Sequence, residues 1–395
     1  MGGRGRGGQD HYRAADRRRP ERRGRDVRPG PERANAPTGH ATIGPQAAAT
    51  VTIAKHRPLA PGATFTDADG DLVTVNLLGP AGTAAVYLTD GFGPISELDL
   101  SGTDSARSVL RISVKKGPLG DGRVAIDEVV GTGVKLFAAP KADLVEAGMT
   151  FTSFVGSLSL GNVENGADLA LAGAPPTANG ATAITVGVIG DGTDISITGA
   201  PLGRLKAVAV GVGSIAAPSI GSVVVTGRAK TRTTPAVPGD FESSLTIAGA
   251  GVAAKVPALK SLRVAGAVSG GTILAGGAAG TVGDVGSVKA GAFVGSRLFA
   301  GYSGPDNGSG TFNAPGSVGS FVVTGKSDAF ARSYVIAGAL KSVRLASVKT
   351  DNGGTRFGFL AHESIRHLSV ADPAFRYASG GSITQGLGDF EANIV

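Results

Sequence analysis

The sequence predicts an all-β protein whose main part is a β-solenoid, a parallel β-helix built from stacked repeats. Three observations predict it: short runs alternate apolar and polar residues, Gly and Ser end most of these runs, and one short motif recurs along the second half of the chain. Alternation with a period of two is typical of a half-buried strand, and Gly and Ser favour turns. One repeat cannot bury its apolar face alone, whereas stacked copies can.

The recurring motif is an apolar residue, then Gly or Lys, then Ser, then an apolar strand. It is clearest from Leu259 to Ala300, where two copies follow one another. Copies begin at Val155, Ile220, Leu259, Val285, Val318 and Leu340, with looser ones at Leu202 and Ile365. We predict a solenoid over residues 151–395 with coils of about 22–26 residues. Loops inserted at Lys230–Pro238 and Gly304–Pro315 would carry any recognition, because loops vary more freely than coils.

Two segments precede the predicted solenoid. Residues 1–46 are rich in Arg, Gly and Pro and have almost no large apolar side chains, so we predict a disordered tail that cannot offset its ordering entropy. Residues 47–150 hold short strand-like runs between turn formers and no convincing helical stripe. We predict a small β module there that caps or leads into the first coil, because the end of a stack needs a closing surface.

The excess of positive charge belongs to the tail. The chain has 38 Lys and Arg, 31 Asp and Glu and a net charge of +7. Residues 1–34 contain 11 of the basic and 5 of the acidic residues, which leaves 27 basic against 26 acidic in the remainder. The Arg-Gly repeats of this tail resemble those of RNA-binding proteins, but interspersed acids and a single aromatic, Tyr12, weaken phosphate binding. We therefore do not expect nucleic acid as a partner, and keep association through the tail as a third hypothesis.

Composition excludes further classes of protein. The sequence contains 64 Gly and no Cys, which excludes a disulfide scaffold and a cysteine-ligated metal site. It has no apolar run of about 18 residues, so we predict no membrane-spanning helix. The segment Ala41–Ala54 follows arginines but is interrupted by Pro45 and Gln46, and we recognise no signal peptide in it.

From about Ala47 onward the chain resembles the β-strand-repeat proteins found in large numbers in Planctomycetes and Verrucomicrobia. The resemblance rests on the acidic turn and strand Phe65–Val75, on Gly120–Val124 with Gly131–Val134, and on the Gly-Ser-apolar repeats. It implies a secreted or cell-surface solenoid, and it carries no catalytic residue to this chain.

Asp67, Asp69 and Asp71 are the candidate metal ligands. Carboxylates at alternate positions offer oxygen atoms, the ligands that Ca²⁺ prefers, although one loop supplies only three of the six to eight required. An EF-hand would also need Gly at the position of Leu72 and Glu at the position of Leu78. The alternative is an acidic turn that enters a strand, because Asp forms local hydrogen bonds to the backbone. Ca²⁺ is the one cofactor that we consider.

We predict no catalytic residue. His362 and His367 are five residues apart, so on one strand they would face opposite sides and would not share a zinc ion. The best cluster for polysaccharide chemistry comprises Asp351, His362, Glu363, Arg366, His367 and Asp372. Surface charges on the last coils explain that cluster equally well, and the chain has no Trp to stack on a sugar.

The sequence therefore predicts a non-enzymatic protein, extracellular or on the cell surface, with a structural, adhesive or display role. Its partners would be a surface polysaccharide or other surface proteins. The main alternative is a carbohydrate-active β-helix, either a polysaccharide lyase or a hydrolase.

Overall fold

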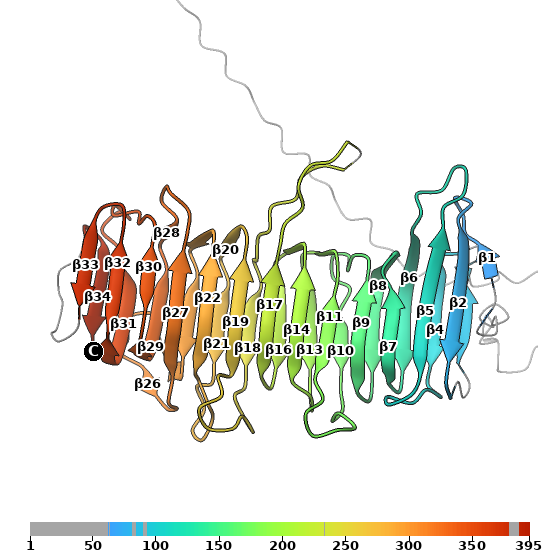
Figure 1. Ribbon diagram of the computed structural model, residues 1–395, viewed down its shortest axis with the longest axis horizontal. Coiled ribbons are helices and arrows are strands. Elements are labelled where there is room, and N and C mark those ends of the chain that lie inside the picture. Colours follow the sequence, from blue (N-terminus) through green and yellow to red (C-terminus); the bar gives the residue numbers. More distant parts are fainter. Residues whose placement is uncertain (1–61, 63, 81–83, 90–92, 233, 379–386) are drawn as a thin grey trace, which may run out of the picture. The chain divides into compact units, whose positions relative to one another are not determined.

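The computed structural model describes residues 62, 64–80, 84–89, 93–232, 234–378 and 387–395. The chain divides into two compact units, Met1–Ile53 and Ala54–Val395, and all described residues belong to the second. The tail predicted at residues 1–46 therefore lies outside the described residues. The named elements of the described residues, β1 to β34, are all β-strands, which confirms the all-β prediction (Figure 1).

Most strands join one large and mostly parallel sheet of 27 strands. Two long ladders run through it. The first, ladder A, consists of parallel strands in the order β5 (Val109–Lys115), β7 (Val134–Ala139), β9 (Val155–Leu160), β11 (Thr182–Thr185), β14 (Leu202–Ala207), β17 (Ile220–Val225), β19 (Leu259–Val264), β22 (Val285–Ala290), β27 (Ser317–Val323), β30 (Val343–Leu345) and β32 (His367–Val370).

The second ladder, ladder B, is also parallel and is built from the strands that alternate with those of ladder A. Its order is β4 (Ile95–Leu100), β6 (Val124–Gly131), β8 (Ala142–Phe151), β10 (Leu169–Leu171), β13 (Thr193–Ile197), β16 (Gly213–Ala217), β18 (Ser244–Ile247), β21 (Thr272–Ala275), β24 (Arg297–Ala300), β29 (Tyr334–Leu340), β31 (Phe357–Ile365) and β34 (Phe390–Ile394).

A third, shorter set of parallel pairings, ladder C, lies between them in the chain order. It contains β12 (Val188–Ile189) with β15 (Ala209–Val210), and β20 (Ala267–Ser269) with β23 (Ala292–Val294) and β28 (Phe330–Ala331). Isolated bridges through Phe241 join the two groups. From β14 the chain passes to β15, then β16, then β17, and so adds one strand to ladders A, C and B in turn, whereas from β5 to β11 its strands alternate between ladders A and B alone.

Antiparallel strands stand at both ends of the parallel ladders. At the start, β1 (Thr64–Thr66) pairs with β2 (Leu72–Leu78), β2 pairs with β5, and β3 (Ala85–Leu88) pairs with β4. At the end, β33 (Phe375–Ala378) pairs with β32. These strands reverse the direction of pairing at each end, and the parallel pairings β7–β9 and β8–β10 continue across residue 150. The module boundary at residue 150 stays a prediction.

The predicted motif copies from Leu202 onward stack on one another, whereas β11 lies between the copy at Val155 and the copy at Leu202. Their first residues are successive register partners: Leu202, Ile220, Leu259, Val285, Val318, Leu340 and Ile365. The Gly that follows lies close to the preceding strand, because a Cβ atom added to Gly286 would be 2.4 Å from the carbonyl oxygen of Lys260. Equal spacing in the sequence is thus unnecessary, since loops absorb the extra residues while the register is kept.

Apolar side chains that point inward from the ladders form one continuous core. In ladder A the inward position is filled by Leu205, Val223, Leu262, Val288 and Phe321, which are all buried. Burial of a side chain of this size contributes about 1.5–3 kcal/mol to the free energy of unfolding. Towards the C-terminus the core becomes aromatic, with Phe293, Phe321, Phe330, Phe357, Phe359 and Phe390 in edge and stacked contacts.

The two loops that the sequence marks as insertions behave differently. Arg228 and Val237 form an antiparallel bridge at the base of the first, whose described residues 229–232 are exposed. The second forms a hairpin of β25 (Tyr302–Ser303) and β26 (Thr311–Phe312). Tyr302 packs with Phe299, Ile336 and Leu360 in a separate apolar cluster on the outer side of ladder B. The second loop therefore covers part of the sheet.

Candidate carboxylate site and charge distribution

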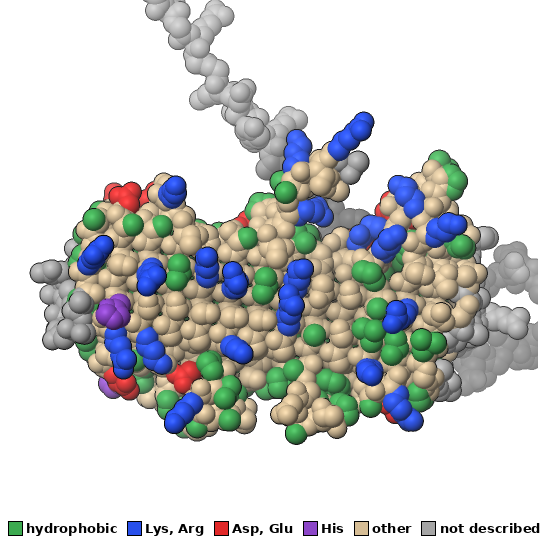
Figure 2. Space-filling model, viewed as in Figure 1, with side chains coloured by type: hydrophobic (Ala, Val, Ile, Leu, Met, Phe, Trp, Pro, Cys, Tyr) green, Lys and Arg blue, Asp and Glu red, His purple; other side chains and the backbone are tan. Residues whose placement is uncertain are grey.

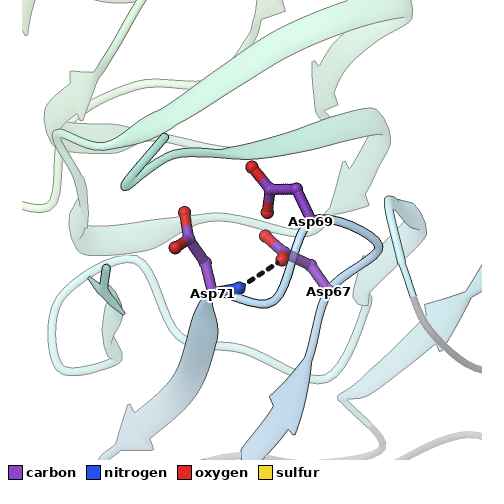
Figure 3. Close-up of side chains that lie close together, drawn as sticks. All are labelled: Asp67, Asp69 and Asp71. Carbon is purple, nitrogen blue, oxygen red and sulfur yellow. Dashed lines mark hydrogen bonds between the residues drawn. The ribbon is translucent and has the colours of Figure 1, made fainter. Parts of the chain in front are cut away.

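The acidic turn between β1 and β2 is a closed local structure (Figure 3). The Oδ1 atom of Asp67 accepts a hydrogen bond of 2.7 Å from the backbone N–H of Asp71, and the two backbones also bond to each other. Gly70 has a φ of 97°, a left-handed conformation that Gly adopts without strain. The sequence Asp-Ala-Asp-Gly-Asp therefore forms this turn for a local reason, as the structural alternative to a metal site predicts.

Asp71 is fully buried and connects this turn to a distant loop. Its carboxylate accepts hydrogen bonds from the backbone N–H groups of Gly117, Gly122 and Arg123. A Cβ atom added to Gly120 would lie 1.6 Å from Asp71 Oδ1, so the loop can approach the carboxylate only with Gly at that position. Both oxygens of Asp71 are therefore used to fix the loop that precedes β6.

The carboxyl groups of Asp67 and Asp69 lie close enough together to shift each other's pKa. Burial, together with the hydrogen bond to Asp69, raises the pKa of Asp67 to about 6. The same hydrogen bond, with another from the backbone N–H of Asp121, lowers the pKa of Asp69. Near neutral pH this pair carries close to two negative charges, which a bound cation would stabilise.

The three carboxylates form the one group of three or more acidic, His or Cys side chains at metal-ligand spacing among the described residues, with one oxygen of each within 4.8 Å of the others. A shallow pocket beside them is lined by further polar side chains, including Asp121, Arg123 and Asp143. The carboxylates of Asp67 and Asp69 offer the oxygen ligands that Ca²⁺ prefers, whereas the Asp71 carboxylate already accepts three backbone hydrogen bonds. The Ca²⁺ site stays a prediction, with Asp71 as its support.

The histidines of the proposed polysaccharide cluster are on different ladders. His362 is in β31 of ladder B, where its ring stacks on Phe312 at 4.9 Å and Nδ1 lies 3.2 Å from the carbonyl oxygen of Val395. His367 is in β32 of ladder A, in a hollow that Arg344, Arg376 and Tyr377 also line. Within the described part of the chain the cluster's acids and histidines make no metal-ligand group.

Charge is segregated between the two long ladders, which the sequence analysis missed. The strands of ladder A contain no Asp or Glu, and their basic residues are Arg111, Lys115, Lys135, Arg204, Lys206, Lys260, Arg263, Lys289 and Arg344. The strands of ladder B contain one Arg, Arg297, and the acids Glu97, Asp99, Asp127, Glu128, Asp143, Glu146, Asp194, Glu363 and Glu391. The nearly balanced charge of the chain outside residues 1–34 hides this separation.

The crowding of acids on ladder B affects their titration. Burial and the nearby charge of Glu146 raise the pKa of Asp127. Arg297 is held by an ion pair with Asp306, 2.7 Å away, in the loop that covers ladder B. The sequence does contain a signal for this segregation, because the strands that become ladder B rarely carry Lys or Arg. The signal can be recognised only once each strand is assigned to its ladder.

Comparison with models of known protein families, with curated proteins and with solved structures finds no match to this chain. The resemblance to β-strand-repeat proteins therefore remains an expectation from the sequence. Among the described residues no helix has the length and apolar character needed to cross a membrane.

Proposed function

We propose that residues 151–395 form a β-solenoid, preceded by a smaller β module, and that the protein acts in a non-enzymatic structural, adhesive or display role at the cell surface or outside the cell. The observation that carries the proposal is the unbroken register of the motif starts from Leu202 to Ile365. A chain that returns alternately to ladders A and B, with short strands of ladder C in its later passages, is what successive coils of a solenoid produce. A scaffold of this kind presents long, regular faces, and such faces suit repeated contacts with extended partners.

The outward side chains support a binding or display role better than a catalytic one. Between the charged positions they are small, as at Ser222, Ser261, Ser287 and Ser320, which form a row of register partners on ladder A. Among the described residues, one set of three carboxylates has the spacing of metal ligands, and one of the three, Asp71, is engaged in hydrogen bonds that hold the fold. A non-catalytic surface requires only regular exposure of such groups.

A polysaccharide-processing β-helix is the second candidate, and one observation favours it. Arg344, His367, Arg376 and Tyr377 line one hollow at the end of ladder A, and a basic group beside an anionic sugar is what elimination chemistry requires. The lining of this hollow contains no carboxylate, so hydrolysis by an acid pair finds no support there.

The proposal can be tested on intact cells of the source organism and on the purified chain. Antibody labelling of intact cells should match labelling after permeabilisation, and incubation with acidic polysaccharides should give neither new reducing ends nor the ultraviolet absorbance of unsaturated sugars. Labelling that requires permeabilisation contradicts a surface role. Release of sugar products that is lost in His367→Ala supports the second candidate instead.

A further inference from the structure

A row of cations runs along the outer face of ladder A. Its positions are register partners on consecutive strands: Lys206 in β14, Val224 in β17, Arg263 in β19, Lys289 in β22, Val322 in β27, Arg344 in β30, Ser369 in β32 and Arg376 in β33. We call Lys206, Arg263, Lys289, Arg344 and Arg376 the cation row. Figure 2 shows Lys and Arg side chains along the viewed face, with acidic side chains near its margins.

The cation row is exposed and has no neutralising partner among the described residues. All five side chains are exposed, and the ion pairs of the described chain involve other residues, namely Arg107, Arg123, Arg297 and Arg356. Arg263 and Lys289 are direct register neighbours. Like charges placed opposite one another on paired strands destabilise a sheet. The row therefore costs stability in the free protein, and an anion bound along it would remove that cost.

The spacing of the row fits a linear partner. Neighbouring strands lie about 4.8 Å apart, so the five steps from β14 to β30 place Lys206 and Arg344 roughly 24 Å apart. A small anion would contact two of these cations at most. Two shallow hollows follow the row, one lined by Arg204, Arg263 and Lys289, the other by Arg344 and Arg376.

A second row of polar groups accompanies the cations. Ser222, Ser261, Ser287 and Ser320 are register partners two residues before the cation-row positions, so they lie on the same outer face and are half-buried. Hydroxyl groups beside cations match a polymer that carries hydroxyl and acidic groups in every unit. Outward positions of ladder A from β14 to β30 carry no aromatic side chain, which single-stranded nucleic acid would need for stacking.

We propose that the cation row of ladder A binds an acidic polysaccharide lengthwise, with Lys206, Arg263, Lys289 and Arg344 contacting its acidic groups and the Ser row its hydroxyls. The inference rests on the proposed surface role, and it specifies the chemistry of the partner and the residues that would bind it. It also locates recognition on a coil face, whereas the sequence predicted it on inserted loops.

The test measures binding of the full chain to polygalacturonate by titration calorimetry at several salt concentrations. The double variant Arg263→Gln/Lys289→Gln should weaken binding about tenfold, because an exposed charge contact contributes roughly a factor of three to five. The slope of log affinity against log salt should fall by roughly one for each cation removed. Lys326→Gln/Arg332→Gln removes the same charge from exposed loop positions off the row and should leave binding unchanged.

Two further arms keep the result interpretable. Arg263→Lys/Lys289→Arg keeps the charges and should retain binding, and thermal melting of each variant checks its fold. Equal weakening by the double variant and the loop control would assign binding to net charge or to the arginine-rich tail, and would overturn the inference. Preference for poly(U) over polygalacturonate, lost in the double variant, would also overturn it in favour of nucleic acid. Absence of binding to polygalacturonate would overturn the inference and leave the surface role intact. Binding that is followed by cleavage would support the inference and contradict the non-enzymatic role.

Discussion

The buried carboxylate of Asp71 accepts a hydrogen bond of 2.6 Å from the backbone N–H of Gly117, although 46 residues separate the two in the chain. The same carboxylate also accepts from Gly122 and Arg123, so one side chain holds the turn before β2 against the loop before β6. Hydrogen bonds from N–H groups to a buried carboxylate are among the stronger ones in proteins. Asp71 is therefore a structural residue of the first strands.

Asp71→Asn should lower the free energy of unfolding by at least about 2 kcal/mol. The amide presents one N–H₂ group to backbone N–H donors, so at least one charged hydrogen bond is lost and a buried donor is left unpaired. Urea unfolding measures the change. Asp69→Asn is the matched control, because it removes an equal charge from an exposed neighbour. Equal unfolding midpoints for the two variants would show that Asp71 does not fix the loop.

Asp67 should make stability depend on pH between about 4 and 6. Its pKa is raised from 3.8 to about 6 in the folded protein, so the folded state binds more protons than the unfolded state in that window. Its contribution to stability is therefore fully present below pH 4 and is lost as pH rises through 6. Asp67→Asn should be as stable as the wild type near pH 4 and more stable near pH 7, where it should also melt at a higher temperature. The gain in the free energy of unfolding at pH 7 should be less than about 1 kcal/mol, because the site is half-exposed. An unchanged difference across this range would contradict the raised pKa.

The predicted Ca²⁺ site leads to a separate prediction near neutral pH, where bound Ca²⁺ should raise the stability that ionisation of Asp67 lowers. With both Asp67 and Asp69 ionised, Ca²⁺ at ten times its dissociation constant should add roughly 1.4 kcal/mol to the free energy of unfolding. Melting with Ca²⁺ and with Mg²⁺ measures this gain, and Asp67→Asn/Asp69→Asn should abolish it. If the double variant responds to Ca²⁺ as the wild type does, the ion does not bind at these carboxylates.

Inward and outward positions of ladder A should differ sharply in their tolerance of substitution. Leu262 is buried and fills the core, so Leu262→Ala should cost about 2–5 kcal/mol. Val224 is on the outward side of the same ladder and is partly exposed, and Val224→Ala should cost below about 1 kcal/mol. Urea unfolding of both variants is the measurement. Similar losses would mean that the two residues do not face opposite sides.

Local patterns in the sequence were sufficient for the strands and their stacking. The alternation in the run from Leu259 predicts which side chains are buried, and Leu262 and Val264 are indeed in the core. The repeat of an apolar residue, Gly and Ser predicted where the copies begin, and in the structure the first residues of the copies from Leu202 to Val318 are register partners. The acidic turn at Asp67 was also readable, since its hydrogen bonds are local.

Long-range relationships were not readable, because they depend on which strands become neighbours. The partners of Asp71 lie 46 to 52 residues away, and nothing near Gly117 or Arg123 in the sequence marks them as donors to a carboxylate. His362 and His367 are on different ladders because the chain turns at Arg366, where the sequence suggested one continuous strand. The loop at Gly304–Pro315 was predicted as a recognition element, yet its one aromatic residue, Phe312, packs against the apolar cluster on ladder B.

The sequence by itself determined the all-β class, the inward apolar positions and the starts of the repeated copies, since these follow from local patterns along the chain. Only the tertiary structure decided the distribution of charge. Lys206 and Arg344 are 138 positions apart in the printed sequence, and they share a row because every passage of the chain returns to ladder A. A total charge is a sum over the chain and keeps no record of direction, whereas binding depends on which charges face the same side.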